Sequence, residues 1–153
     1  VLDLESTDLQ AIASLFRAYA ASLPISLDYQ DFDAELAALP GKYAPPKGAL
    51  ILARNDAGAA IGCVAMRPLD EAGVCEMKRL YVAPAGRGRG LGKQLALAII
   101  ETARAAGYRE MRLDTLPTMT SAIALYEQLG FTRIGAYYDT PIEETVFMSL
   151  KLM

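Results

Sequence analysis

The segment from Ala85 to Gln94, AGRGRGLGKQ, constrains the fold of this chain more than any other stretch. It contains four glycines and three basic residues, and it separates a predicted strand at 74–82 from a proline-free, alanine- and leucine-rich stretch at 91–106 that predicts a helix. Glycines allow tight turns and let backbone N–H groups approach an oxyanion, and the N-terminus of a helix adds positive partial charge. The sequence therefore predicts a strand–loop–helix unit that cradles a phosphate.

Two well-known phosphate-binding patterns do not fit this segment. With Gly92-Lys93 aligned to the end of a Walker A loop, the pattern requires glycine at 87 and Ser or Thr at 94, but the chain has Arg87 and Gln94. The dinucleotide pattern G-x-G-x-x-G fails in all three registers, because its last glycine falls on Leu91, Lys93 or Leu95. These failures argue against the interpretation of the segment as a phosphate-binding module for a nucleotide such as ATP or NAD.

Proline and glycine divide the chain into short elements without a repeat or a long linker. We predict helices at 9–19, 32–39, 91–106 and 121–129, and strands at 49–53, 60–66, 74–82, 111–115, 133–138 and 144–152. The order is two helices, three antiparallel-looking strands, and then β-loop-α-β-α-β-β. This order predicts an α+β domain around a central mixed sheet, and 153 residues suit a single domain over 1–153.

Composition excludes several kinds of chemistry. The chain has no histidine, so triads and metal sites that depend on histidine are absent, and with only Cys63 and Cys75 as thiols we expect no metal site. Both cysteines are interpreted as small buried residues of a reducing compartment. The net charge of −3 and the pI near 5.0 argue against a nucleic-acid partner.

The location is predicted from what the sequence lacks. No stretch reaches the ~18–20 consecutive apolar residues that a membrane span requires. No charged and then apolar leader opens the chain either. We therefore expect a cytoplasmic protein without a membrane contact.

The pattern that does fit the glycine-rich segment is R-x-x-G-x-G, as Arg87, Gly90 and Gly92. With this loop the chain resembles the GNAT superfamily of acetyl-CoA-dependent N-acetyltransferases. The stretch 76–84, EMKRLYVAP, is similar to the family's fourth strand, and 122–131, AIALYEQLGF, is similar to its last helix and the Gly-Phe that follows. The resemblance covers about 50–152 in order, and it implies a GNAT-type fold with a mostly antiparallel sheet and about four helices.

The resemblance also implies a site for acetyl-CoA, the acetyl-donor cosubstrate. Backbone N–H groups of the loop would hold the pyrophosphate, and the strand before it would pair with the pantetheine arm. The cofactor-binding residues implied are Leu80, Tyr81, Val82, Arg87, Gly88, Arg89, Gly90, Leu91, Gly92 and Lys93. Two other interpretations of the loop are a solvated surface loop without a ligand and, for Arg87 and Arg89, a patch that binds nucleic acid. The chain departs from the family at Met119, where an asparagine is common, and Thr118, Thr120 or Ser121 is left to supply the polar contact.

Two catalytic residues are implied. Tyr126 occupies the place of a tyrosine that protonates the departing CoA thiolate or hydrogen-bonds its sulfur. Glu76 occupies the place of the glutamate that serves some members as general base, and an amine that titrates near 10.4 must lose a proton before it can attack. The alternatives are a core tyrosine with a satisfied hydroxyl and a strand glutamate paired with Lys78 or Arg79.

The resemblance implies an enzyme that moves an acetyl group from acetyl-CoA to a primary amine, of a small molecule or a peptide, by direct attack in a ternary complex. The alternative is a non-catalytic acyl-CoA-binding regulator. The sequence leaves open whether the protein forms a homodimer. The resemblance also implies that acetyl-CoA lies in a cleft between the strand that ends near Val82 and the strand that begins near Met111. We expect the acceptor pocket to be shaped by aromatic and acidic residues that flank this cleft: Tyr29, Phe32, Tyr137, Tyr138, Glu143 and Glu144.

Overall fold

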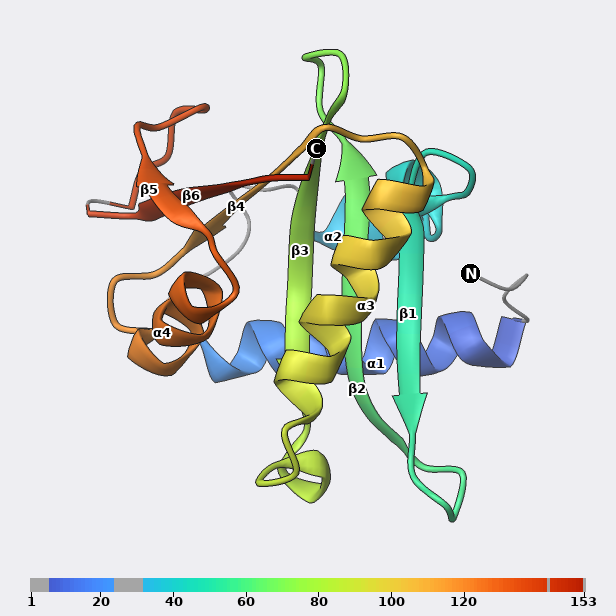
Figure 1. Cartoon of the computed structure of the whole chain (residues 1–153). Coiled ribbons are helices and arrows are strands. Elements are labelled where there is room, and N and C mark those ends of the chain that lie inside the picture. The colour runs from blue at the N-terminus through green and yellow to red at the C-terminus, as the bar shows by residue number, and fades with distance from the viewer. Residues whose placement is uncertain (1–5, 24–31, 143, 153) are drawn as a thin grey trace.

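The computed structural model describes residues 6–23, 32–142 and 144–152 (Figure 1). The helices in these ranges are α1 (Ser6–Ser22), α2 (Phe32–Ala37), α3 (Leu91–Ala105) and α4 (Thr120–Gln128), with short 3-10 turns η2 (Gly41–Tyr43) and η3 (Pro84–Gly86). The strands are β1 (Ala49–Arg54), β2 (Ala60–Pro68), β3 (Val74–Val82), β4 (Glu110–Thr115), β5 (Thr132–Ile134) and β6 (Val146–Lys151).

The described strands form one six-stranded sheet in the order β1-β2-β3-β4-β6-β5. Every neighbouring pair is antiparallel except β3 and β4, which run parallel because α3 connects them as a crossover. The prediction of an α+β fold with a mixed, mostly antiparallel sheet and about four helices is thus confirmed.

Helices cover both faces of the sheet, as Figure 1 shows for α3 in front of β1–β3 and α1 behind them. Helix α3 is amphipathic, because its apolar residues recur at helical spacing and point to the sheet. Its buried residues are Leu95, Ala96, Ile99, Ile100 and Ala103. On the opposite face a second apolar cluster joins α1 and α2 to the sheet through Ile12, Leu15, Phe16, Phe32, Tyr43, Leu50, Cys63 and Ala65.

Strands β3 and β4 separate soon after they pair, and we call this separation the fork. Their parallel pairing covers Val74–Glu76 of β3 and ends at the pair Glu76 and Arg112. Beyond that pair β3 continues to Val82 along β2, while β4 continues along β6. Beyond Glu76, the edge of β3 that faces β4 therefore has no partner strand among the described residues.

A β-bulge in β3 coincides with the fork. The β2–β3 register shifts between Cys63 and Ala65, and on the β3 side of this shift Arg79 has a φ of 59°, in the left-handed region. A bulge adds a residue to one strand and increases its local twist, which turns β3 away from β4.

The bulge is anchored to α2. The Arg79 guanidinium donates two hydrogen bonds to the Glu35 carboxylate, each 3.0 Å long, and lies 5.2 Å from the centre of the Phe32 ring. Arg79 is only 5% exposed. The strained residue of the bulge thus forms a buried, bidentate ion pair with a helix that packs on the sheet.

Several element boundaries differ from the predictions. Helix α1 runs over Ser6–Ser22, three residues beyond the predicted 9–19 at each end, and β2 ends at Pro68, two residues later than predicted. Helix α2 ends at Ala37, two residues before the predicted end, and β5 ends at Ile134 instead of 138. Tyr137 and Tyr138 leave the strand because their hydroxyls reach acidic side chains on β3 and β4. Strand β6 begins at Val146 and not at 144, since Glu144 has a φ of 60° that a strand does not accommodate.

Candidate active site

A cleft of about 470 Å³ lies in the fork between β3 and β4, a size typical of small-molecule sites. The end of α1 borders it on one side and the start of α4 on the other. Its lining residues are Tyr19, Ser22, Leu23, 77–82 of β3, Arg87, Gly92, 113–116, 118–122 and Tyr126. The predicted cleft between the strand that ends near Val82 and the strand that begins near Met111 is therefore present.

The glycine-rich loop adopts the backbone conformation that its composition predicts. Gly88 and Gly90 have φ values of 84° and 70°. A Cβ atom at either position would meet no heavy atom within 4 Å, so it is the backbone conformation and not the protein's own packing that requires glycine there. The open space above both glycines leaves room for a ligand.

The same loop presents a row of unused donors. Residues 88–93 all lie in the described chain, and none of their backbone N–H groups donates a hydrogen bond to a protein acceptor. Three of these groups belong to the first turn of α3, where the first i→i−4 bond runs from Gln94 N–H to Gly90 O at 3.1 Å. The loop and helix start therefore form a site suited to an anion.

Within 87–93, Arg87 is the residue whose backbone N–H already donates to a protein acceptor. Its backbone N–H donates to Pro84 O at 3.3 Å, and its side-chain Nε donates to Val82 O at 3.0 Å. The side chain thus ties the loop to the end of β3. Arg87 also lines the cleft.

The unpaired edge of β3 lies along the cleft. Leu80, Tyr81 and Val82 all line it and are half-buried, and none of them pairs with β4. Tyr81 packs edge-on against Tyr19 of α1, with ring centres 6.1 Å apart. The backbone here can accept an extended ligand as an added strand.

Helix α4 contributes Tyr126, which lines the cleft and is 7% exposed. Burial raises the pKa of its phenol well above the usual range, with smaller contributions from Tyr19 and Asp114. In the described part of the chain, no protein group forms a hydrogen bond with this hydroxyl. Tyr126 is therefore a protonated donor without a partner inside the described protein.

The start of α4 carries the residues named above as substitutes for the family's asparagine. Met119 occupies the N-cap position and makes no capping hydrogen bond, and it accepts at its sulfur from the Thr115 hydroxyl at 3.5 Å. Thr118, Thr120 and Ser121 line the cleft beside it. All three predicted substitutes are thus available on the cleft wall.

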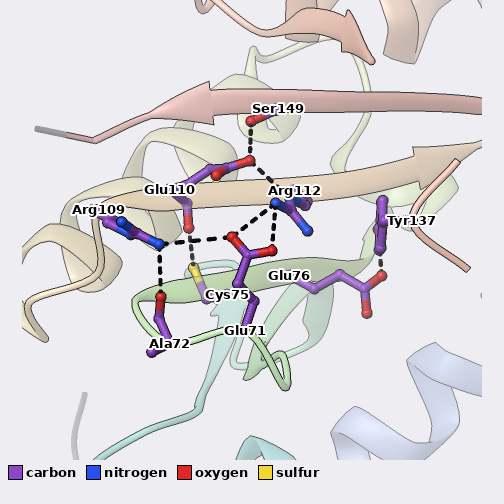
Figure 2. Close-up of polar contacts among 9 residues, drawn as sticks. All are labelled: Glu71, Ala72, Cys75, Glu76, Arg109, Glu110, Arg112, Tyr137 and Ser149. Carbon is purple, nitrogen blue, oxygen red and sulfur yellow. Dashed lines mark hydrogen bonds and ion pairs between the residues drawn. The ribbon is translucent and has the colours of Figure 1, made fainter. Parts of the chain in front are cut away.

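Glu76 lies at the base of the fork and is not among the residues that line the cleft. It is 1% exposed, and both of its oxygens are occupied. Oε1 accepts from Arg67 Nε at 2.8 Å. Oε2 accepts from the Tyr137 hydroxyl at 2.5 Å, a contact that Figure 2 shows. The alternative pairing with Lys78 is present at 3.9 Å, whereas Arg79 pairs with Glu35. The structure therefore does not bring Glu76 and Tyr126 to the same surface.

The sequence analysis assigned no site role to three charged residues that line the cleft: Arg79, whose guanidinium pairs with Glu35, and Lys78 and Asp114. Lys78 of β3 and Asp114 of β4 both line the cleft, each two residues beyond the last pair of the fork. Burial lowers the pKa of Lys78, and the Glu76 carboxylate opposes that shift. Asp114 Oδ2 accepts from the Tyr138 hydroxyl at 2.6 Å. Alternation of side chains along the two strands was the available signal for both residues.

The residues predicted for the acceptor side fall into three groups. Tyr137 and Tyr138 hold Glu76 and Asp114 from the connection between β5 and β6, and the two rings pack against Phe147 with centres 5.2 and 5.3 Å away. Phe32 is buried under Arg79, and Glu144 is exposed. Tyr29 and Glu143 lie outside the described residues.

Next to the base of the fork, an ion-pair network joins three segments (Figure 2). Glu71, in the turn between β2 and β3, pairs with Arg112 at 3.2 Å and Arg109 at 3.7 Å. Glu110 accepts from Arg112 at 2.8 Å and from Ser149 of β6 at 2.7 Å, and the bond from Arg112 lowers the pKa of Glu110. These contacts fasten the closed end of the fork and lie outside the cleft.

Within the described ranges, no group of three or more Cys, Asp or Glu side chains could hold a metal ion. No helix in the part of the chain that the structure describes is both long and apolar enough to cross a membrane.

Comparison with known proteins gives consistent matches. The sequence profile of the Acetyltransferase (GNAT) family matches residues 10–131. An uncharacterised N-acetyltransferase of Schizosaccharomyces pombe is 42% identical over 145 residues, which cover 95% of this chain and 89% of the relative.

Two solved structures share the fold. A GNAT-family acetyltransferase of Staphylococcus aureus superposes with a TM-score of 0.81 at 20% identity, over 99% of this chain and 98% of the other. A GNAT superfamily phosphinothricin acetyltransferase of Sinorhizobium meliloti, crystallised with acetyl-CoA, gives a TM-score of 0.71 at 23% identity over 98% and 86% of the two chains.

Proposed function

This chain belongs to the GNAT family of acetyltransferases, and on this basis we propose that it transfers the acetyl group of acetyl-CoA to a primary amine by direct attack in a ternary complex. The observation that carries the proposal is the row of backbone N–H groups at 88–93 without a protein acceptor, placed where a cleft opens beside an unpaired strand edge.

The proposed cofactor site follows that geometry. The N–H groups of Gly88 to Lys93 hold the pyrophosphate, with Arg87, Arg89 and Lys93 supplying positive charge. The edge of β3 at Leu80, Tyr81 and Val82 offers backbone groups to the pantetheine arm. This arrangement directs the acetyl end of the ligand toward the bulge at Arg79, deeper in the fork.

The transfer step needs three groups around the thioester. The neutral amine nitrogen attacks the carbonyl carbon, and a backbone N–H of residues 80–82 stabilises the oxyanion that forms. The C–S bond then breaks, the acetyl group stays on nitrogen as an amide, and the sulfur leaves as CoA thiolate. The extra proton on nitrogen passes to a base.

Tyr126 is the proposed acid on the leaving sulfur. Tyr126 lines the cleft, its hydroxyl has no hydrogen-bond partner among the described residues, and the phenol is kept protonated because burial raises its pKa. Such a phenol stabilises a thiolate by donating a hydrogen bond as the C–S bond lengthens.

The base is assigned to a carboxylate on the acceptor side. Glu76 stays the predicted base, although it does not line the cleft and its oxygens already accept from Arg67 and Tyr137; Lys78, 3.9 Å from Oε1, is its contact among the cleft-lining residues. Asp114 is a second candidate, which lines the cleft directly and accepts a hydrogen bond from Tyr138. Separate Glu76→Gln and Asp114→Asn variants distinguish the two.

A thermal-shift titration with acetyl-CoA, CoA, ATP and NAD at equal concentrations tests the cofactor site. A ligand at ~100 times its Kd stabilises by about 2.7 kcal/mol, or roughly 5–10 °C for a domain of this size. We expect the shift with acetyl-CoA and CoA only. An equal shift with ATP or NAD would favour the nucleotide module, and no shift with acetyl-CoA would refute the proposal.

A turnover assay then separates the enzyme from the acyl-CoA-binding regulator. The assay follows release of the CoA thiol with a panel of primary amines and confirms the amide product by mass spectrometry. Binding of acetyl-CoA without turnover of any amine would favour the regulator.

A further inference from the structure

A second cavity, of about 350 Å³, lies beside α2 and η2. Arg67 of β2 lines it, and its other lining residues come from one short stretch of the chain: Ala34, Glu35, Ala38, Pro40, Gly41, Lys42 and Tyr43. The cleft in the fork shares none of these residues. The acetyl transfer proposed above assigns no role to this cavity.

The Tyr43 side chain brings a buried hydroxyl to the second cavity. Tyr43 is 3% exposed, and no group in the described chain forms a hydrogen bond with its hydroxyl. The Glu35 carboxylate lies nearby, but its two oxygens accept from Arg79, each at 3.0 Å. Burial raises the pKa of the Tyr43 phenol well above the usual range, and the charge of Glu35 raises it further. The hydroxyl is therefore protonated and able to donate.

Packing fixes the Tyr43 ring in this position. The ring meets the Phe16 ring edge-on, with centres 6.1 Å apart. The Tyr43 backbone N–H donates to Pro40 O at 2.8 Å, and a Cβ atom at Gly48 would lie 2.5 Å from the Tyr43 carbonyl carbon, so the following turn passes directly against it. The hydroxyl therefore cannot turn toward another protein acceptor. Because buried polar groups in native proteins nearly always have a partner, this one points to a ligand.

Arg67 supplies a second set of unused donors. Its Nε donates to Glu76 Oε1 at 2.8 Å, while its two terminal nitrogens donate to no group among the described residues. The side chain keeps 28% exposure and interacts electrostatically with Tyr43 and Glu35, so the guanidinium lies close to both. Lys42, which is exposed, adds a further cation to the lining. The lining thus offers hydrogen-bond donors to a ligand.

We propose that the second cavity binds a small oxyanion, a carboxylate or a phosphate group, between the Arg67 guanidinium and the Tyr43 hydroxyl. The terminal N–H groups of a guanidinium match the oxygens of such an anion. The Glu35 carboxylate opposes the anion little, because Arg79 neutralises it in a bidentate pair. A cationic or purely apolar ligand would leave the donors of Tyr43 and Arg67 unpaired.

The bound anion is distinct from acetyl-CoA and from its acceptor, since the second cavity and the cleft have no lining residue in common. Its binding is therefore measured without acetyl-CoA and without turnover. Failure of the acetyl transfer and failure of the anion site are separate results.

Titration of the unmodified, isotope-labelled chain followed by NMR tests the site. The probes are sodium phosphate and sodium acetate, each added at an ionic strength held constant with sodium chloride. We expect at least one of them to shift the Arg67 Nε–H signal and the backbone amide signals of 41–44 in a saturable way, and a response to only one tells phosphate from carboxylate. Shifts confined to 88–93 would place the anion in the glycine-rich loop and overturn the proposal, as would no saturable shift with either anion.

Tyr43→Phe removes the hydroxyl and keeps the ring. We expect the Kd of the anion to rise about 10- to 100-fold, the range for a hydrogen bond to a charged group, while the Tm without the anion stays equal or increases because no protein partner is lost. Tyr126→Phe is the matched control, since it removes a hydroxyl without a described partner from the cleft and should leave the Kd unchanged. An unchanged Kd in Tyr43→Phe would contradict the proposal.

Arg67→Lys provides a second test that does not depend on the folding of the Tyr43 variant. Lysine keeps a cation for Glu76 but lacks the bidentate guanidinium, so the Kd should again rise about tenfold or more. A folded Arg67→Lys variant that binds the anion as tightly as the unmodified chain would count against the proposed site.

Discussion

The buried ion pair between Arg79 and Glu35 provides the sharpest test of how this fold is held together. Glu35→Gln removes the charge but keeps the shape, and it leaves the Arg79 guanidinium buried at the bulge with the Phe32 ring still 5.2 Å away. Breaking a buried pair on one side costs about 3–5 kcal/mol. The Glu35 side chain retains 14% exposure, so we expect the lower end, about 3 kcal/mol.

The chain offers a matched control for this variant. Glu71 also pairs with arginines, at 3.2 and 3.7 Å, but its side chain is 53% exposed. Exposed pairs contribute about 1 kcal/mol or less because water screens them. Glu71→Gln therefore tests the same chemical change outside the core.

Thermal unfolding followed by circular dichroism measures the difference. At about 2–4 °C per kcal/mol for a domain of this size, Glu35→Gln should lower Tm by about 6–12 °C and Glu71→Gln by less than about 4 °C. A double variant with Arg79→Met should lose less than the sum of the single changes, because both remove one interaction. A Tm loss for Glu35→Gln no larger than that for Glu71→Gln would contradict the role assigned to burial.

Four further predictions concern the site and the fork. Tyr126→Phe should leave the Kd for acetyl-CoA unchanged and lower kcat about tenfold or more, since general-acid contributions reach about 10²–10⁴-fold; unchanged kcat would remove its proposed acid role. Asp114→Asn and Glu76→Gln, compared by the pH dependence of kcat/KM, should differ, because only loss of the true base abolishes the acidic limb of the profile. Gly90→Glu should abolish the thermal shift by acetyl-CoA, whereas Gly90→Ala should lose about 1–2 kcal/mol of stability from its left-handed φ and bind more weakly. Glu110→Gln should lower Tm at pH 7, and the difference should vanish in acid: the pKa of Glu110 lies below its ordinary 4.5, so its contribution is present above that value and is lost as the pH falls through the lowered pKa.

Much of this architecture is encoded locally. Helix α3 begins at Leu91 because the alanine- and leucine-rich stretch starts there, directly after the glycine-rich loop. Gly88 and Gly90 adopt left-handed φ values because glycine has no Cβ atom to oppose them. The order of strands and helices could also be predicted from local patterns, because proline and glycine end helices and strands within a few residues of their own position. Tyr126, which the resemblance placed in the last helix, lines the cleft from α4.

The roles of charged residues depended on contacts that no local pattern contains. The family resemblance implied that Glu76 acts as a base, but Arg67 and Tyr137, from other segments of the chain, occupy its oxygens. Lys78 and Asp114 face the cleft only because the parallel pairing of β3 with β4 ends at Glu76 and Arg112. Neighbours far apart in sequence thus decide whether a carboxylate is a buried partner or a wall of the site.

Backbone preferences and short spacings were enough to specify the glycine-rich loop, the order of the elements and the family, because each of these is written within a few neighbouring residues. Where the sheet opens depends instead on long-range pairing. The fork exists because the bulge at Arg79 increases the twist of β3 while β4 stays hydrogen-bonded to β6, and Glu35 of α2 holds that bulge in place. Its location, and therefore the charges that meet an acceptor, follow from strand pairing across the whole fold.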